Sequence, residues 1–187
     1  QPFFNGVDHK DIDSAVEAAL KKGRIGVIMI ETPANPTNGL VDIAYIREVA
    51  DRIGEAQGGY RPPVVVDNTF LGPVFSHPLQ HGADIAVYSL TKYVGGHSDL
   101  VAGGATGSKD MMKLVRGLRS SLVTQLDAQT SWMLLRSLET LSLRVERANE
   151  NARLIAEYLR GHPKIDSVNY LGSVSYTHLR AHETLLD

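Results

Sequence analysis

The 187-residue sequence contains no cysteine, so it forms no disulfide and offers no thiolate to a metal ion or to covalent catalysis. A chain without cysteine fits a reducing compartment, and we expect a cytoplasmic protein. The formal net charge is only −2, which gives no field that would attract nucleic acid or an anionic membrane. No apolar run approaches the roughly 20 residues that span a membrane, and no signal peptide is visible. We therefore expect neither nucleic acid nor a membrane as a partner.

The first residue of the sequence is Gln1 and not methionine. This beginning predicts a fragment or a processed piece of a longer protein. With 43% hydrophobic and 21% charged residues the composition is that of a globular protein. The length suffices for one domain with a sizeable core. Residues 174–187 carry no pattern that continues the fold, and we predict that they are a non-native tail.

Short apolar runs alternate with helical patterns in the first half of the chain. Helices are predicted after Asp11 or Asp13, each a candidate N-cap, and after Asp42, because apolar residues follow at spacings of three and four. Strands are predicted at residues 25–30, 64–66, 84–88 and 100–106. The first is a continuous apolar run, which is typical of a parallel strand buried on both faces. This order predicts an α/β fold with a mostly parallel sheet flanked by helices.

The second half of the chain is predicted to be helical from Lys109 onward. Apolar residues between Leu138 and Leu159 alternate steps of three and four, a spacing that a coiled coil shares. We favour long helices lying across the sheet, one of them kinked. Alanine at two of the seven positions would offer little apolar surface to the partner helix of a coiled coil. Gly161 with the following His-Pro is predicted to end the last helix, and residues 165–171 are predicted to begin another strand.

Residues 88–93, Tyr-Ser-Leu-Thr-Lys-Tyr, place two hydroxyls and a lysine at the end of a predicted strand. Asp67 follows the three valines of the preceding strand, where a carboxylate needs a partner. Ligands of open α/β sheets bind outside the carboxyl ends of the strands, so Asp67, Lys92, Ser89 and Thr91 are expected to converge. A lysine amine forms a Schiff base with an aldehyde, a carboxylate can hold a pyridinium proton, and hydroxyls can hold a phosphate. These groups together predict a site for pyridoxal 5′-phosphate (PLP).

Plainer alternatives exist for these residues. A lysine beside two hydroxyls also fits a solvated strand end, and Asp67 also fits a cap of the following turn. His97 and Asp99 are secondary candidates for the site, with the organisation of a Gly-rich loop as the alternative. The proline-rich loop of residues 32–39 contains Asn35, and a stiff loop at a strand end is suited to holding one side chain still.

Two further patterns are candidate binding sites. Residues 103–109, Gly-Gly-Ala-Thr-Gly-Ser-Lys, resemble a phosphate loop but fail the P-loop pattern, in which lysine follows the second conserved glycine. A nucleotide-binding α/β module is the alternative that they leave open. His77 and His81 lie four residues apart, as do His178 and His182, but neither pair has the glutamate of a zinc-protease helix. We expect no metal site.

Three motifs, in this order, resemble those of the Cys/Met-metabolism PLP-dependent enzymes. This family includes cystathionine γ-synthase, cystathionine γ- and β-lyases, methionine γ-lyase and the homoserine sulfhydrylases. The motifs are Glu-Thr-Pro-Ala-Asn-Pro at residues 31–36, Val-Val-Asp-Asn-Thr-Phe at 65–70, and residues 88–93 with Gly-Gly-His-Ser-Asp at 95–99. Residues 136–141 and 170–172 fit a later part of the same family, so the resemblance extends over residues 20–172.

The resemblance implies a role for each candidate residue. Lys92 resembles the Schiff-base lysine and Asp67 the partner of the pyridine nitrogen. Ser89 and Thr91 resemble phosphate ligands, and Asn35 resembles the residue that hydrogen-bonds the 3-hydroxyl of the cofactor. The implied fold is the large domain of the aspartate-aminotransferase type (fold type I), which residues 1–173 would form in part.

The resemblance also implies a PLP-dependent lyase or transferase of transsulfuration. Such an enzyme acts on sulfur amino acids or activated homoserine by γ-elimination or γ-replacement. Family members are usually homotetramers built from dimers that share active sites. They are about twice as long as this chain, which lacks an N-terminal part and the C-terminal domain with the arginine that binds the substrate carboxylate. A catalytically inactive fragment is therefore the alternative, and synthase, lyase and sulfhydrylase share the motifs present here.

Overall fold

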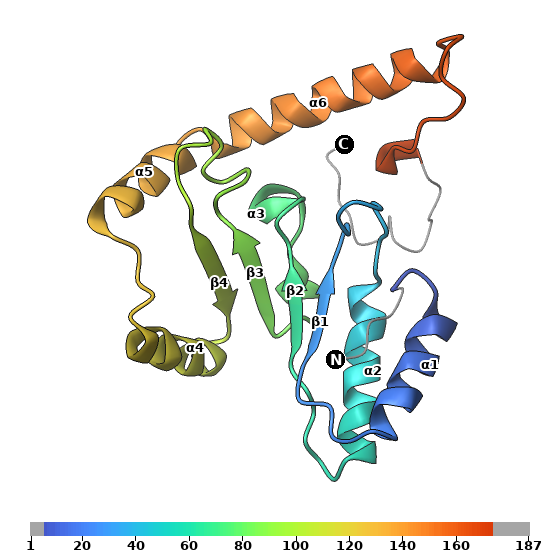
Figure 1. The fold of residues 1–187 in the computed structure, drawn as a ribbon, viewed down its shortest axis with the longest axis vertical. Helices are drawn as coiled ribbons and strands as arrows, with labels where there is room; N and C mark the ends of the chain where they lie inside the picture. The colour runs from blue at the N-terminus through green and yellow to red at the C-terminus, as the bar shows by residue number, and fades with distance from the viewer. Residues whose placement is uncertain (1–5, 174–187) are drawn as a thin grey trace.

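A four-stranded sheet is the centre of the computed structural model, which describes residues 6–173 (Figure 1). The strands lie side by side in chain order: β1 (Ile28–Glu31), β2 (Val64–Asp67), β3 (Ile85–Ser89) and β4 (Gly103–Gly107). The first three run parallel, whereas β4 pairs antiparallel with β3. The predicted α/β fold with a mostly parallel sheet is confirmed.

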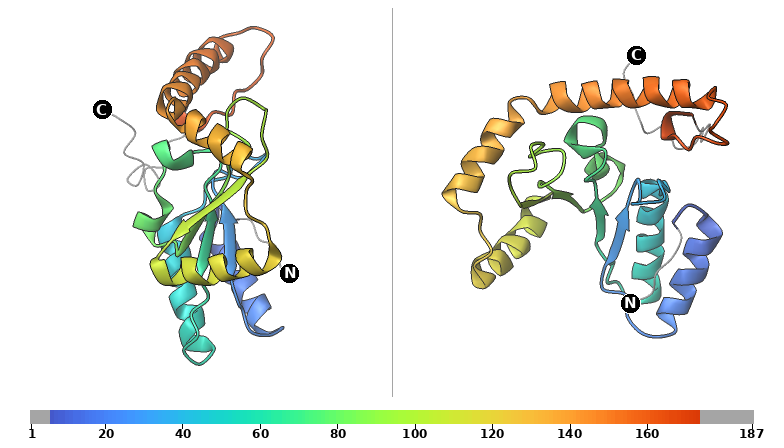
Figure 2. Two further views of the ribbon diagram at one scale, coloured as in Figure 1. Left: turned by 90° about the vertical axis from the view of Figure 1, so that its left-hand side faces the viewer. Right: turned by 45° about the horizontal axis from the view of Figure 1, so that its top comes forward.

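Helices occupy most of the remaining described residues. The α-helices are α1 (His9–Leu20), α2 (Ile43–Ala56), α3 (Gly72–Phe75), α4 (Lys109–Leu122), α5 (Ala128–Leu138) and α6 (Leu141–Arg160). Two short 3-10 helices, η1 (Pro78–His81) and η2 (Leu171–Ser173), complete the set. In Figures 1 and 2, α4 lies at one end of the strands and α6 at the other.

Helix α2 covers one face of the sheet. Its predicted cap is confirmed, because the Asp42 carboxylate accepts a hydrogen bond from the Tyr45 N–H at 3.1 Å. Apolar residues at spacings of three and four then form a buried stripe: Ile46, Val49, Ala50 and Ile53. The stripe packs in one cluster with Ile12 of α1 and with Val64 and Val66 of β2. Each valine or isoleucine buried in this way contributes about 1.5–3 kcal/mol to folding.

The opposite face of the sheet is open among the described residues. Along β1, Ile28 and Ile30 are buried, but Met29 between them is 61% exposed. The prediction that this run is buried on both faces is therefore wrong, and the strand begins at Ile28 rather than at Ile25. The physical reason is that α1 and α2 both pack in the same cluster with Ile28 and Ile30, and no described helix covers Met29.

A second, smaller core lies beyond the carboxyl ends of the parallel strands. Val94 and Leu100, from the segment after β3, pack with Leu134 of α5 and Leu141 of α6. This cluster attaches the segment that contains Lys92 to the two C-terminal helices.

Three local predictions differ from the structure. The cap of α1 is Asp8, whose carboxylate accepts from the Lys10 N–H at 2.9 Å, and not Asp11 or Asp13. The long apolar pattern forms two helices separated by Glu139 and Thr140, so the expected kink is a complete break. Residues 165–171 form no strand, and Leu171 instead begins the 3-10 helix η2. Gly161 ends α6 as predicted.

No helix within residues 6–173 is long and apolar enough to cross a membrane. The predicted non-native tail, residues 174–187, lies outside the described residues, as do His178 and His182.

Candidate cofactor site

Asp67 and Ser89 lie at the same edge and on the same face of the sheet. Asp67 is paired in register with Val87, and Ser89 follows Val87 by two positions. Because side chains alternate along a strand, Ser89 projects to the same side as Val87 and therefore as Asp67. This side is the open face described above. The convergence predicted for Asp67 and Ser89 is thus built into the strand pairing.

The hydroxyl of Thr69 connects the two strand ends. It donates to Asp67 Oδ1 at 2.6 Å and accepts a hydrogen bond from the Ser89 N–H at 2.8 Å. The Thr69 N–H donates to the same carboxylate oxygen at 3.0 Å. One oxygen of Asp67 therefore caps the turn, as the plainer alternative proposes. The second oxygen, Oδ2, accepts no hydrogen bond from any described residue, so the cap leaves it available to a ligand.

Asn68 anchors the same turn from the buried side. It is 0% exposed, and its Nδ2 donates to the carbonyls of Gly72 and Ser76 at 3.1 and 3.0 Å. These bonds fasten the short helix α3 beneath the strand end. Neither Asn68 nor Thr69 is among the site residues predicted from the sequence. The signal was their position directly after Asp67, because polar residues that follow a buried strand need hydrogen-bond partners.

Lys92 lies in a compact turn after β3. The Lys92 N–H donates to the Ser89 carbonyl at 3.1 Å, and the Lys92 carbonyl accepts from the Gly96 N–H at 2.8 Å. The side chain is exposed, and its amine pairs with no carboxylate of the described residues. A fixed backbone with a free amine is the arrangement that covalent attachment of an aldehyde requires.

Thr91 differs from Ser89 in the state of its hydroxyl. Thr91 Oγ1 accepts from the Ala102 N–H at 2.9 Å and donates to the Ala102 carbonyl at 3.2 Å. Its hydrogen is thus used to fasten the Lys92 turn to the segment before β4. The Ser89 hydroxyl has no hydrogen bond to the described residues. Ser89 is therefore the better placed phosphate donor, and Thr91 would have to exchange the Ala102 carbonyl for a phosphate oxygen.

The side chains of Asn35, His97 and Asp99 make no hydrogen bond or ion pair with this network among the described residues. Asn35 is exposed in the loop after β1, whose ends are closed by a hydrogen bond from the Ala34 N–H to the Gly39 carbonyl at 2.9 Å. His97 Nδ1 lies 2.8 Å from the Gly95 carbonyl oxygen, and Asp99 Oδ2 lies 4.0 Å from Arg136 Nη2. His97 and Asp99 thus make the loop-organising contacts that were their alternative.

The Gly-rich stretch at 103–109 is a strand and a helix cap, not a phosphate loop. Residues 103–107 are β4, and Ser108 caps α4 by accepting from the Met111 N–H at 3.3 Å. Glycine is needed at 107 because a Cβ there would lie 2.6 Å from the Asp84 carbonyl oxygen. The close packing of two strands explains this glycine without a nucleotide.

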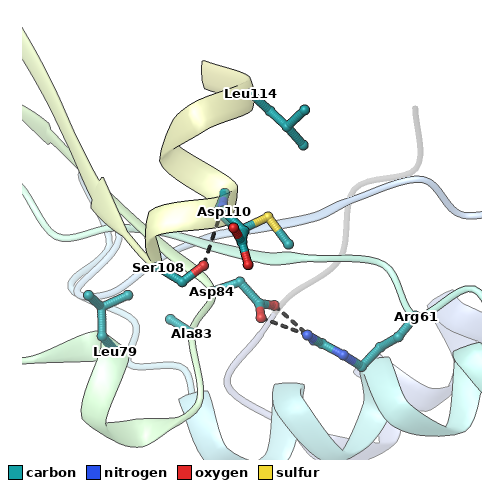
Figure 3. A pocket seen from close by; sticks show the side chains of 8 residues that line it. Arg61, Leu79, Ala83, Asp84, Ser108, Asp110 and Leu114 are labelled. Carbon is teal, nitrogen blue, oxygen red and sulfur yellow. Dashed lines mark hydrogen bonds and ion pairs between the residues drawn. The ribbon is translucent and has the colours of Figure 1, made fainter. Parts of the chain in front are cut away.

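A cavity lies at the opposite end of the sheet, where β3 begins and β4 ends (Figure 3). It has a volume of about 520 Å³ and is open. Its walls include Asp84, Arg61, Met111 and Leu114. Asp84 is held there by two bonds from Arg61, at 2.8 and 2.6 Å, and by the Val64 N–H at 2.8 Å. Its acceptors are thus already used, which marks this cavity as structural rather than as the cofactor site.

The residues at the carboxyl edge fit PLP by the chemistry of their donors and acceptors. Lys92 offers an amine, Asp67 an oxygen with no described donor, and Ser89 an uncommitted hydroxyl, all at the ends of two neighbouring parallel strands. A Schiff-base lysine with an acidic partner for the ring nitrogen is the known protein contribution to PLP chemistry. Fold and residue set together define the class of PLP-dependent enzyme domains.

Comparison with known proteins establishes the family. The sequence pattern of the family "Cys/Met metabolism PLP-dependent enzyme" matches residues 4–186. The chain belongs to this family, and the predicted resemblance and the predicted cofactor are confirmed.

Individual relatives agree with the family assignment. The chain is 36% identical over 175 residues to a cystathionine gamma-lyase of Bacillus subtilis, covering 93% of this chain and 43% of the relative. It is 37% identical over 174 residues to a cystathionine gamma-synthase of Mycobacterium leprae, covering 92% and 42%. The chain thus spans less than half the length of the curated relatives that it matches.

Solved structures show the same fold. Apo CalE6, a methionine gamma lyase from Micromonospora echinospora, superposes with a TM-score of 0.81 at 32% identity, covering 97% of this chain and 48% of that one. A cystathionine gamma synthase from Xanthomonas oryzae pv. oryzae, solved with aminoacrylate and cysteine, gives 0.80 at 30% identity, covering 96% and 44%. These shares agree with the prediction that the chain forms only part of the family fold.

Proposed function

We propose that the protein is a PLP-dependent enzyme of transsulfuration, which acts on sulfur amino acids or activated homoserine by γ-elimination or γ-replacement. The observation that carries this proposal is the arrangement of Asp67, Ser89 and Lys92 at the carboxyl ends of two neighbouring parallel strands. The family match and the names of its relatives support the reaction class. Synthase, lyase and sulfhydrylase share the motifs present here, so the proposal names the reaction class and does not choose among these three activities.

Each residue has a role that its contacts support. PLP supplies an aldehyde for covalent attachment and a pyridinium ring that accepts electrons from a substrate carbanion. Lys92 would provide the amine for that attachment, and the same amine would move protons at the α and β carbons of the substrate. Asp67 Oδ2 holds the proton of the ring nitrogen, because Oδ1 is engaged by Thr69. Ser89 donates to the phosphate.

Two further residues complete the proposed set. Thr91 donates to the phosphate after releasing the Ala102 carbonyl, which makes it a weaker ligand than Ser89. Asn35 hydrogen-bonds the 3-hydroxyl of the cofactor from the loop after β1, which ends at the same edge of the sheet as β2 and β3.

The decisive experiment is to purify the full-length protein with PLP and record its visible absorbance band. We expect a band in the wild type, its loss in Lys92→Ala, and its retention in the control Lys113→Ala, whose side chain is exposed on α4. Borohydride reduction followed by peptide mass spectrometry should place the cofactor on Lys92. A wild-type protein that binds no PLP would overturn the proposal.

We infer separately that residues 1–187 alone do not form a competent site. The open face of the sheet carries Met29, and α4 exposes Leu114, Leu118 and Leu122 by 73%, 62% and 62%. Such side chains favour association when nothing covers them. Fluorescence titration of the 187-residue chain with PLP is expected to show no saturable binding. Saturable binding would contradict this inference and leave the proposed reaction class intact.

Partners and location are also proposals. The substrate is an amino acid, and the full-length protein is a homotetramer built from dimers that share active sites, which light scattering coupled to size-exclusion chromatography would measure. A cytoplasmic location stays a prediction that cell fractionation tests. The expectation of no nucleic-acid and no membrane partner also stays a prediction.

A further inference from the structure

Arg144, in the first turn of α6, contacts the backbone immediately after Lys92. Its Nη1 donates to the Tyr93 carbonyl at 2.7 Å, and its Nη2 donates to the Val94 carbonyl at 3.1 Å. Arg144 is 52 positions beyond Lys92 in the sequence, so the contact depends on the tertiary fold. It fixes the two peptide groups that follow the proposed cofactor lysine.

The same guanidinium group is anchored at the break between α5 and α6. Nη2 also donates to the Ser137 carbonyl at 2.9 Å, and Nε donates to Thr140 Oγ1 at 3.1 Å. Ser137 is buried, so this anchor is firm. No carboxylate of residues 6–173 lies within ion-pair distance of Arg144. The donors of its planar guanidinium group therefore join the break between α5 and α6 to the Lys92 loop.

Gly96 shows how closely the loop is pressed against this arginine. Its φ of +75° lies in the left-handed region, and a Cβ at this position would lie 2.6 Å from Arg144 Cζ. The apolar contacts of Val94 and Leu100 with α5 and α6 lie in the same loop. The loop is thus held by packing and by one multidentate side chain.

We propose that Arg144 is a positioning residue for Lys92. By fixing the Tyr93 and Val94 carbonyls, Arg144 holds the backbone of Lys92 at the carboxyl edge of the sheet. The Lys92 side chain therefore extends from a fixed Cα position. This inference rests on the proposed function of Lys92. It adds to that function a residue on a distant helix that touches neither substrate nor cofactor.

The first test needs no cofactor, because trypsin cleaves after lysine. In the full-length apoprotein, the rate of cleavage at the Lys92–Tyr93 bond reports how often the loop opens. Arg144→Gln is expected to raise this rate about tenfold or more, since two charge-assisted hydrogen bonds to the loop are lost. Arg144→Lys should fall between Arg144→Gln and the wild type. The control Arg153→Gln removes an exposed arginine of the same helix, which pairs with Glu157 at 2.7 Å, and should cleave at the wild-type rate.

The second test uses the holoenzyme. Arg144→Gln is expected to bind PLP about tenfold more weakly and to shift the pH at which the visible band titrates, because the Lys92 amine is displaced; a purely structural role would leave that pH unchanged. If circular dichroism shows that Arg144→Gln does not fold, the cleavage rates and band titrations of Arg144→Lys and Arg153→Gln are compared instead. Wild-type cleavage and an unshifted band in the Arg144 variants would overturn this proposal alone. A wild-type protein without the band would overturn the proposed function as well.

Discussion

Thr69 donates its hydroxyl hydrogen to Asp67 Oδ1 at 2.6 Å, and this bond decides which carboxylate oxygen remains for a ligand. The same hydroxyl accepts the Ser89 N–H at 2.8 Å, so the ends of β2 and β3 share one polar atom. A short side chain thus orients the proposed partner of the ring nitrogen and fixes its separation from the proposed phosphate ligand. The turn cap uses Oδ1, whereas the proposed cofactor site would use Oδ2, so the two alternatives for Asp67 are compatible.

Replacing Thr69 by valine tests this link. Thr69→Val keeps the shape of the side chain but removes the hydroxyl, so the Ser89 N–H loses its acceptor and Asp67 loses a donor. We expect a loss of about 1–2 kcal/mol in the free energy of unfolding, measured by urea titration without added cofactor. We also expect weaker PLP binding, because the carboxylate can rotate.

The matched control is Thr69→Ser, which retains the hydroxyl and should retain most of the stability and the PLP affinity. Equal stability and equal PLP affinity in the valine and serine variants would show that the hydroxyl does not organise the strand ends.

The strand ends were predictable because short apolar runs interrupted by polar residues are local features of the sequence. The runs before Asp67 and before Ser89 each mark a buried strand, and the rule that ligands bind at the carboxyl ends of parallel strands brings the two residues together. The cap at Asp42 was predictable for the same reason, since its signal lies within three residues of the helix start.

The remaining features depend on contacts between distant segments. No spacing in the sequence indicates that Arg144 reaches the Lys92 loop, because the contact requires the break between α5 and α6. The pairing of Thr91 with Ala102 requires β4 to return antiparallel beside β3. The open face of β1 was missed because an apolar run does not reveal whether helices cover both of its sides.

Gly96→Ala is expected to destabilise the Lys92 loop. Alanine at a φ of +75° costs roughly 1–2 kcal/mol, and its Cβ would also displace the Arg144 guanidinium group. The urea midpoint should therefore fall. Gly117→Ala is the matched control: Gly117 lies within α4 with open space around it, so alanine should stabilise the protein by about 0.5–1 kcal/mol. Shifts of the same sign in both variants would contradict this reasoning.

Asp84→Asn is expected to weaken the opposite end of the sheet. The Asp84 side chain is 12% exposed and accepts two hydrogen bonds from Arg61, so removing its charge leaves the partly buried guanidinium paired only with the more exposed Asp51, 3.6 Å from its Nε, among the described residues. A loss of about 2 kcal/mol in the free energy of unfolding follows at neutral pH. The control Asp51→Asn removes a carboxylate that is 51% exposed, and it should cost less than about 1 kcal/mol. Equal losses would show that burial does not strengthen the Arg61–Asp84 pair.

The contribution of Asp84 should also depend on pH in a defined direction. Burial alone raises the pKa of Asp84, but hydrogen bonds from Arg61 and the Val64 N–H, with the positive charges of Arg61 and Arg47, outweigh it and leave the pKa below its ordinary value of 3.8. The unfolded chain therefore binds a proton at a higher pH than the folded chain, and stability rises with pH between the two pKa values. The stability gap between the wild type and Asp84→Asn should be full at about pH 5–7 and should shrink as the pH falls below 3.8 through the folded pKa. Urea unfolding of both proteins across this range measures the gap. A gap that stays constant under acid conditions would mean that the Asp84 charge contributes nothing to folding.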